Sequence, residues 1–230
     1  MSKQKIFIAC DTTSPQELRQ IISKSKTNKI KIGYKIGLEF FLSPKGRSFV
    51  SKLKNKKIFL DLKLNDIPNT CASAIKSLGD LKNISYLTVH TNGGLDMLKA
   101  AKKASKQINK KVKILGVTVL TSFSNSSIKK VGHTKSIKEL VKKQASLAKV
   151  AKLDGIVCSG FEAKFLQSIC KNMEIITPGI RFSGDNKGDQ KRVMTPKQAF
   201  SNGATSIVIG RSITKGNIKN NIQKLIKSLN

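Results

Sequence analysis

Two opposite charges lie two residues apart inside an otherwise apolar stretch of the sequence. Asp61 and Lys63 fall within residues 57–64, which are rich in Ile, Leu and Phe and have the composition of a buried strand. Side chains two positions apart on a strand point to the same face, so Asp61 and Lys63 face the same way while Leu62 points away. Because buried charges must be paired, hydrophobic packing does not explain them. We therefore predict a charged functional site on this face.

Two further charged residues extend the pattern. Lys35 lies in the preceding apolar stretch, and Asp66 follows just after the strand. Together these residues predict an alternation of carboxylate and ammonium groups. Carboxylates on both sides of Lys63 favour its protonated form, which suits a proton donor, whereas a Schiff-base lysine needs a lowered pKa. Two alternatives stay open: Lys63 in an ion pair that only stabilises the fold, and Asp66 as a cap of the helix that Pro68 begins.

A second group of residues has the composition of a phosphate site. Residues 177–181 end in Arg181, and residues 209–212 contain Gly210 and Arg211. Arginine binds phosphate through its charge and two directed hydrogen bonds, and glycine permits close backbone approach. Two of only five arginines lie here, after the last two predicted strands, where TIM barrels commonly bind phosphate. We predict a phosphate site, and the alternative is that these are ordinary loop arginines.

Repeating strand–helix units would have to position these residues. Apolar, β-branched stretches alternate with longer stretches of helical periodicity. Strands are predicted at residues 6–11, 31–37, 57–64, 86–91, 113–121, 155–159, 174–180 and 206–210. Helices are predicted to begin at Pro15 and Pro68 and to cover residues 44–54, 94–107, 136–153, 162–170, 196–202 and 218–229.

Eight such units in 230 residues predict an α/β protein, a single (β/α)8 TIM barrel. The strands are apolar on both faces, as expected of a parallel sheet covered by helices. No linker or break in composition divides the chain, so we expect one domain over residues 1–230. A doubly wound sheet is the alternative, but the first strand ends in Asp11-Thr12-Thr13 rather than in a glycine-rich turn.

The formal net charge of +31 is the strongest feature of the composition. Such a charge suggests nucleic acid, an anionic membrane or an acidic substrate as a partner. However, the lysines are spread over the whole chain, aromatic residues are 5% of it, and Trp is absent, so groups that stack on bases are scarce. We interpret the charge as a solvated basic surface that speeds capture of a small anion, with no specific nucleic acid partner.

Other features favour a cytoplasmic protein. No apolar stretch approaches the roughly 20 residues of a membrane span, and a strand-like stretch follows the first five residues, which leaves no room for a signal peptide. The cysteines are scattered, without the spacing of a metal site or a disulfide framework, and read as small apolar residues in a reducing compartment. They are Cys10, Cys71, Cys158 and Cys170. We expect no membrane and no metal.

Several stretches resemble the orotidine 5'-phosphate decarboxylase family. Residues 58–70, with the sequence IFLDLKLNDIPNT, are similar to the signature of this family. Residues 117–122, 177–181, 188–193 and the pair Gly210-Arg211 are similar to its other motifs and occur in the expected order. The resemblance extends from Asp11 to Thr214, nearly the whole chain.

The resemblance implies decarboxylation of orotidine 5'-monophosphate to uridine 5'-monophosphate and carbon dioxide, the last step of de novo UMP synthesis, with no cofactor. Lys63 would protonate C6 of the pyrimidine as carbon dioxide leaves. Asp61 would lie near the substrate carboxylate and form the charged network with Lys35 and Asp66. We expect the Lys63 ammonium, preorganised in a site that excludes water, to stabilise the carbanion.

The resemblance also implies how the substrate is held. Asp11 and Lys35 would bind ribose hydroxyls, and Thr121 would contact the pyrimidine edge. The phosphate would be bound by Arg181, Gln190, Gly210 and Arg211, under a lid of residues 182–193. Asp66 and Thr70 would reach into the site of a neighbouring subunit, which implies a homodimer.

Two other functions remain as alternatives. Hexulose-phosphate synthases and keto-gulonate-phosphate decarboxylases share the Asp-x-Lys-x-x-Asp motif but use magnesium. The residues 67–70 and Gln190 argue against them, and metal dependence would discriminate. A basic nucleic-acid-binding protein would instead show binding that weakens steeply with salt.

Overall fold

Eight parallel strands close into a barrel in the computed structural model, which describes residues 4–109, 111–186 and 192–229. Each strand pairs with the next along the chain, and β8 closes the barrel on β1. The strands are β1 (Lys5–Ala9), β2 (Lys31–Gly37), β3 (Ile58–Leu64), β4 (Ile84–His90), β5 (Lys113–Val117), β6 (Gly155–Val157), β7 (Glu174–Ile180) and β8 (Ser206–Ile209). The predicted (β/α)8 barrel is confirmed.

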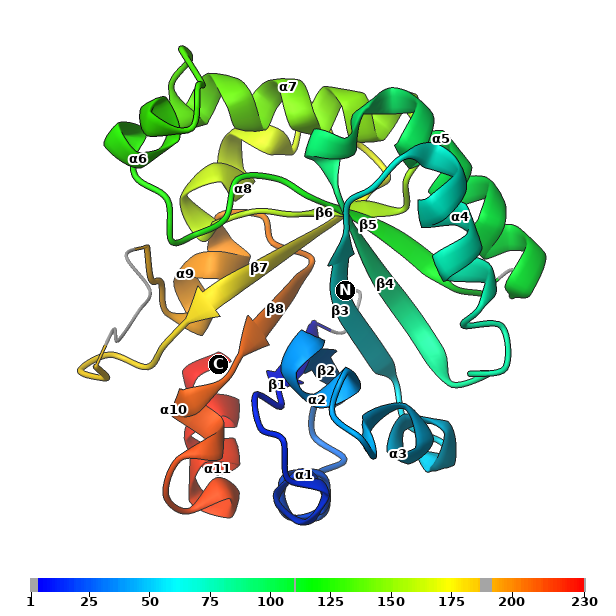
Figure 1. Ribbon diagram of the computed structural model, residues 1–230. Helices are drawn as coiled ribbons and strands as arrows, with labels where there is room; N and C mark the ends of the chain where they lie inside the picture. Colours follow the sequence, from blue (N-terminus) through cyan, green and yellow to red (C-terminus); the bar gives the residue numbers. More distant parts are fainter. Residues whose placement is uncertain (1–3, 110, 187–191, 230) are drawn as a thin grey trace.

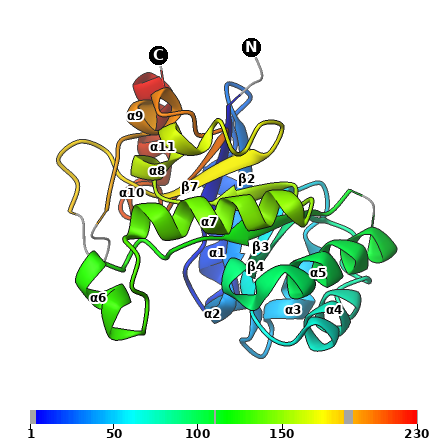
Figure 2. The same ribbon diagram turned by 90° about the horizontal axis from the view of Figure 1, so that it is seen from above.

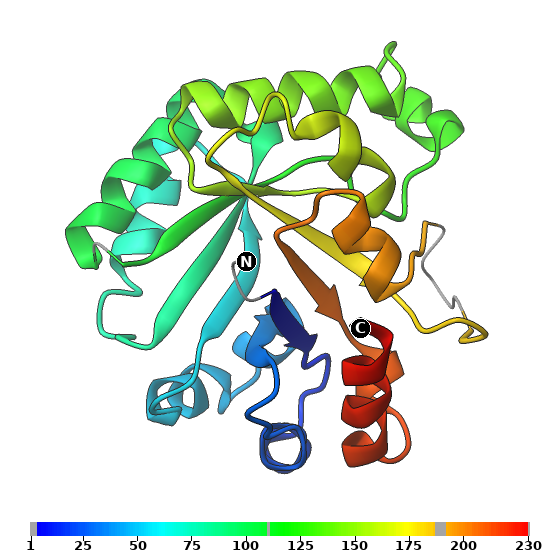
Figure 3. The same cartoon turned by 180° about the vertical axis from the view of Figure 1, so that it is seen from behind.

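The helices form a ring around the strands (Figures 1 and 3). They are α1 (Pro15–Lys24), α2 (Leu38–Phe41), α3 (Gly46–Lys52), α4 (Pro68–Lys76), the 3-10 helix η1 (Thr91–Gly93), α5 (Gly94–Ile108), α6 (Asn125–Lys130), α7 (Ile137–Val150), α8 (Gly160–Leu166), α9 (Pro196–Ser201), α10 (Arg211–Thr214) and α11 (Ile218–Leu229). Figure 2 shows α4 and α5 side by side on the outside of the barrel. In the described part of the chain, no helix combines the length and apolar character that crossing a membrane requires.

Local hydrogen bonds explain where several helices begin. Ser14 accepts a hydrogen bond from the backbone N–H of Glu17 at the start of α1. Capping boxes begin α6, α7, α8 and α9, at Ser124, Ser136, Ser159 and Thr195. Such caps satisfy backbone groups that the first turn leaves unpaired, and each stabilises a helix by about 1 kcal/mol. The sequence at these caps therefore sets the residue at which each of these helices begins.

Some predicted boundaries were wrong. The predicted strand 113–121 ends at Val117, because the following apolar residues form a loop that is closed by a hydrogen bond from Phe123 N–H to the Leu120 carbonyl. The predicted helix 162–170 instead covers Gly160–Leu166. The short helices α2, α6 and α10 were not predicted, because four to six residues are too few to show helical periodicity.

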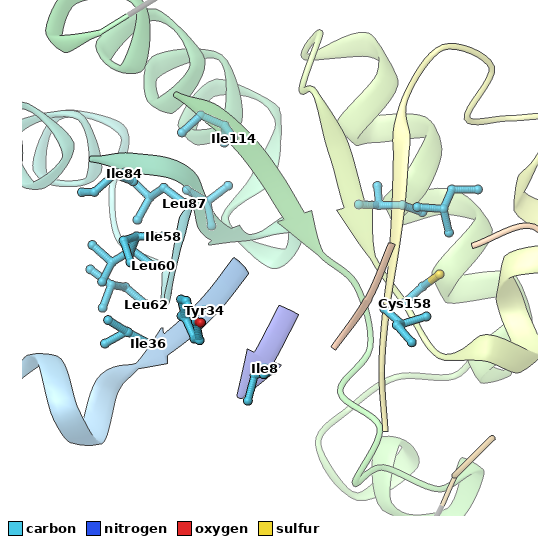
Figure 4. Packing of buried hydrophobic residues seen from close by; sticks show 14 of the residues in the cluster. Ile8, Tyr34, Ile36, Ile58, Leu60, Leu62, Ile84, Leu87, Ile114 and Cys158 are labelled. Atoms are coloured by element: carbon cyan, nitrogen blue, oxygen red, sulfur yellow. The ribbon is translucent and has the colours of Figure 1, made fainter. Parts of the chain in front are cut away.

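Apolar side chains form two separate layers. The larger layer lies between the barrel and the helices, where Ile58, Leu60 and Leu62 of β3 lie beside Ile36 of β2 (Figure 4). A smaller cluster lies inside the barrel and consists of Phe7, Ala9, Phe59, Tyr86, Leu115, Ile176 and Val208. Its aromatic rings meet edge to face at centroid distances of 5.2 and 5.3 Å. These rings fill the amino-terminal half of the barrel.

Candidate active site

A cavity of about 660 Å³ opens at the carboxyl-terminal end of the barrel. Phe59 and Ala9, which belong to the inner cluster, lie at its base. Its charged lining comes from different strands and the loops after them: Asp11, Glu17, Lys35, Asp61, Lys63, Arg181, Arg211 and Lys215. This is the end at which TIM barrels carry their active sites, because the βα loops converge there.

Four of the predicted residues form a continuous chain of ionic contacts. The Lys63 Nζ lies 2.8 Å from Asp61 Oδ2, and the Lys35 Nζ lies 3.5 Å from the same oxygen. Lys35 also donates a hydrogen bond of 3.1 Å to Asp11 Oδ1. Because β1, β2 and β3 are neighbours in the barrel, residues distant in sequence meet here. Three members of the predicted alternation, Lys35, Asp61 and Lys63, are therefore in contact, and Asp11 extends the series beyond Lys35.

Electrostatic interactions keep Asp61 and Lys35 charged. Burial acts to raise the pKa of the Asp61 carboxyl, but the nearby Lys35 and Lys63 and the hydrogen bonds outweigh it and hold this pKa below its usual range. Burial acts to lower the pKa of Lys35, and the Asp61 and Asp11 carboxylates outweigh it and raise this pKa. Asp61 is thus a carboxylate and Lys35 an ammonium at neutral pH.

The backbone of β3 is irregular where it carries the two charged residues. Leu60 pairs with Leu87, but Leu64 pairs with Val89, so three residues of β3 lie opposite one residue of β4. Lys63 has a φ of 47°, in the left-handed region that residues other than Gly, Asn and Asp rarely adopt. The sequence predicted a regular strand here. Strain of this kind costs on the order of 1–3 kcal/mol and is common at functional sites.

An apolar wall lines the part of the cavity next to the charges. It is formed by Val117, Val119, Leu120, Val157, Cys158, Pro178 and Val208. Thr121, predicted to contact a pyrimidine, lines the cavity at the end of this wall. An apolar wall lowers the local dielectric constant and so strengthens the interaction of a bound group with Asp61 and Lys63.

The predicted phosphate residues lie together in the cavity lining. Arg181 follows β7, and Gly210 and Arg211 follow β8. Arg181 is buried, and its Nη1 donates a hydrogen bond of 2.8 Å to the Ile180 carbonyl, which fixes the guanidinium near the cavity. A Cβ at position 210 would approach Ala9 Cβ to 3.3 Å, so glycine keeps this part of the cavity open. With Lys215 nearby, this region suits an anionic group.

Among the described residues, two that the sequence predicted for the site, Asp66 and Thr70, do not line the cavity of this chain. Asp66 is exposed, and its Oδ1 accepts a hydrogen bond of 2.7 Å from the backbone N–H of Ile67. Thr70 is exposed on α4. Ile67, which lies between them in the sequence, is a large apolar side chain that is 67% exposed. Gln190 lies outside the described residues, as does much of the predicted lid.

Contacts that sequence reasoning did not single out support the apolar wall. Arg192 forms an ion pair with the buried Glu162 and donates a hydrogen bond of 3.3 Å to the Leu120 carbonyl. Burial raises the pKa of Glu162, although Arg192 acts in the opposite direction. In the sequence, Glu162 was marked only by its position three residues after Ser159. This spacing is typical of a capping box at the start of a helix and does not indicate a functional site. Among the described residues, no cluster of three or more His, Cys, Asp or Glu side chains has the geometry to hold a metal ion.

The fold and the cavity together define a TIM-barrel enzyme with an ionic group at one part of its active site and arginines at another. The chain matches the model of the "Orotidine 5'-phosphate decarboxylase / HUMPS family" over residues 4–224, and it belongs to this family. The resemblance inferred from the sequence motifs is confirmed.

Individual relatives agree with this assignment. The chain is 46% identical over 229 residues to an orotidine 5'-phosphate decarboxylase of Wolbachia sp. subsp. Brugia malayi (strain TRS), covering 97% of this chain and 98% of the relative. It is 43% identical over 223 residues to one of Prochlorococcus marinus (strain MIT 9215), covering 93% and 90%. The crystal structure of orotidine 5'-phosphate decarboxylase from Lactobacillus acidophilus superposes with a TM-score of 0.85 at 33% identity, covering 99% of each chain.

Proposed function

We propose that this protein decarboxylates orotidine 5'-monophosphate to uridine 5'-monophosphate and carbon dioxide, in the last step of de novo UMP synthesis. The observation that carries the proposal is a single cavity in which Lys63 and Asp61 lie at one part and Arg181 and Arg211 at another. Such a cavity accommodates a substrate with a reacting group at one end and a phosphate at the other. Family membership and the names of the relatives support the same activity.

Lys63 is the proposed proton donor. Loss of carbon dioxide leaves a carbanion at C6 of the pyrimidine, without an adjacent carbonyl group to delocalise the charge. The Lys63 ammonium, already held 2.8 Å from Asp61, would stabilise this charge without reorganisation and then transfer its proton to C6. Asp61 would hold the Lys63 ammonium in position and lie beside the carboxylate that leaves. Lys35 would keep Asp61 ionised.

The remaining predicted residues would bind the substrate. Asp11 and Lys35, which contact each other, would hold ribose hydroxyls, and Thr121 would contact the pyrimidine edge. The phosphate would be held by Arg181, Gly210, Arg211 and Gln190. Binding energy from a phosphate remote from C6 would support the chemical step, which is the usual use of non-reacting parts of a substrate.

We also propose that the chain is one barrel domain that works as a cytoplasmic homodimer. Asp66 and Thr70 would reach the site of the second subunit and complete the network around its Lys63. The exposure of both residues, and of Ile67 between them, supports this arrangement, because burying a large exposed apolar side chain favours association. The charge of +31 would attract an anionic substrate.

The test measures loss of orotidine 5'-monophosphate absorbance in excess EDTA, for the wild type and for Lys63→Ala. We expect metal-independent turnover that falls at least about 10³-fold in the variant, because the acid and the main electrostatic stabilisation are both removed. Uridine 5'-monophosphate should still bind, as measured by calorimetry.

Lys152→Ala is a matched control. Lys152 is also a lysine with positive φ, at 57°, but it is exposed after α7 and does not line the cavity. Turnover in this control should equal that of the wild type. A folded wild type that is inactive in EDTA, and active on a sugar phosphate when magnesium is added, would overturn the proposal.

A further inference from the structure

The bulge in β3 places three residues of this strand opposite a single residue of β4. Asp61, Leu62 and Lys63 lie between the pairs Leu60↔Leu87 and Leu64↔Val89, and Thr88 is the only β4 residue opposite them. Leu62 packs in the apolar layer outside the barrel (Figure 4), whereas Asp61 and Lys63 line the cavity. Regular ladder hydrogen bonds cannot form across such a mismatch, so the backbone here needs another partner.

The Thr88 hydroxyl is that partner. It accepts a hydrogen bond of 2.8 Å from the backbone N–H of Lys63. Because an N–H can only donate, the hydroxyl proton is available for Asp61, and it is donated to Oδ1 at 2.9 Å. The side chain of Thr88 is fully buried, so water does not compete for either bond. One hydroxyl group thus connects the strained backbone of Lys63 to the carboxylate of Asp61.

These bonds use both oxygens of the carboxylate. Oδ1 is held by Thr88, and Oδ2 by the ammonium groups of Lys63 and Lys35. A carboxylate held at both oxygens cannot rotate about its terminal bond without losing contacts. The Lys63 ammonium is therefore fixed twice, through its own backbone N–H and through the oxygen that it contacts.

We propose that Thr88 is a positioning residue for the decarboxylation, which holds the Lys63 ammonium and the Asp61 carboxylate in their reactive arrangement. This inference rests on the proposed function. Thr88 does not line the cavity, so it acts only through these two residues and not on the substrate. Displacing a catalytic group by about 1 Å can cost about 10²-fold in rate, so a residue of this kind should affect turnover strongly.

The experiment compares three substitutions. Thr88→Val keeps the shape of the side chain but removes both hydrogen bonds, and Thr88→Ser keeps the hydroxyl. Thr205→Val is the matched control. The Thr205 hydroxyl also joins two neighbouring strands, since it accepts from Ile175 N–H at 2.9 Å and donates to the Ile175 carbonyl at 3.2 Å, but it lies just before β8 at the opposite end of the barrel.

For Thr88→Val we expect kcat to fall about 30-fold to 100-fold, and KM for orotidine 5'-monophosphate to change less than about threefold. KM should hold because the proposed ribose and phosphate contacts come from other strands. Thr88→Ser should retain kcat within about threefold, because the hydroxyl alone makes both bonds. Thr205→Val should leave kcat and KM at wild-type values.

Turnover is expressed per binding site for uridine 5'-monophosphate, counted by calorimetry, so that unfolded protein does not lower kcat. If Thr88→Val does not fold, Thr88→Ala is measured in the same way, with the same expected split between kcat and KM. Unchanged kcat in the variant, or an equal loss in Thr88→Ser and Thr88→Val, would overturn the role of Thr88. An inactive wild type would overturn the proposed function instead, so the two failures are distinct.

Discussion

The two ends of the barrel each hold a buried carboxylate between two lysines, but of these two carboxylates it is Asp61, not Glu174, that lines the active-site cavity formed by the described residues. At the carboxyl-terminal end, Asp61 lies between Lys35 and Lys63, and all three residues line the cavity. The backbone that carries Lys63 is strained. The charges at this end are therefore accessible to a bound molecule. The strained backbone at Lys63, which costs free energy to form, holds one of them in place.

At the amino-terminal end, Glu174 has a similar set of partners and a different setting. It contacts Lys5 at 3.0 Å, Lys113, and the hydroxyl of Tyr86 at 3.0 Å. The ring of Tyr86 belongs to the cluster that fills the barrel interior, so no substrate reaches this carboxylate from inside. The two lysine side chains are 34% and 42% exposed. This arrangement closes the end of the barrel.

A buried carboxylate between lysines is thus no sufficient sign of catalysis. Burial acts to raise the pKa of Glu174, yet hydrogen bonds and charge from Lys113 and Lys5 hold it below its usual range, as Lys35 and Lys63 do for Asp61. The two carboxylates are therefore alike in charge state. What distinguishes the site is the cavity, the strained backbone and the arginines opposite.

The largest expected difference between the two ends is in activity. Asp61→Asn should lower kcat at least about 10²-fold, because Lys63 loses the carboxylate that holds it in position. Glu174→Gln removes the same charge at the other end and should leave kcat within about threefold of the wild type. Steady-state kinetics with orotidine 5'-monophosphate measure both. A comparable loss of kcat in Asp61→Asn and Glu174→Gln would contradict the conclusion that only the Asp61 end of the barrel is catalytic.

The next difference is in stability. Glu174→Gln should lower the free energy of unfolding by about 1–3 kcal/mol near neutral pH, because Lys5, Lys113 and Tyr86 lose a charged partner. Since the folded pKa of Glu174 lies below its unfolded value, this contribution is present above the unfolded pKa of about 4.3 and is lost as the pH falls through the folded pKa.

Urea unfolding at several pH values tests the sign of this effect. The gap between the wild type and Glu174→Gln should narrow as the pH is lowered from neutral towards 3. Other carboxylates titrate equally in both proteins and cancel in the difference. A gap that widens on acidification would show that Glu174 is not held ionised by its lysines.

The smallest expected effect is that of salt. A basic surface raises the local concentration of an anionic substrate, and this attraction is screened when the Debye length falls below about 10 Å. Raising the salt concentration from about 0.05 to 0.3 M should therefore raise KM a few-fold while kcat stays constant. Glu174→Gln should show the same salt dependence as the wild type. A fall in kcat with salt would instead indicate that the contacts around Asp61 are themselves screened.

Much of the fold was predictable because its signals are local. Apolar stretches of strand length alternate with helical periodicity, and caps such as Ser14, Ser136 and Thr195 mark helix starts within a few residues. Boundaries failed where tertiary contacts decided them: residues 118–121 have the composition of a strand but form the loop that lines the cavity.

The charged residues were also visible from the sequence. Asp61 and Lys63 stood out because charges are rare inside a buried strand, and Arg181 and Arg211 because arginine is rare in this chain. The roles of Asp66 and Thr70 stay predictions, since they depend on a second subunit. Thr88 gave no signal, because threonine is common in strands and only the bulge opposite it makes its hydroxyl distinctive.

By itself, the sequence determined the barrel and the residue types that carry charge at its strand ends, because hydrophobic periodicity and the cost of burying a charge act on each segment separately. Only the tertiary structure decided which charges meet. The distance between Lys35 and Asp61, the left-handed backbone of Lys63 and the hydroxyl that joins them to β4 all depend on closure of the barrel. Closure of the barrel also placed Asp61 at the open cavity, and it placed Glu174 next to the cluster of aromatic rings that fills the barrel interior.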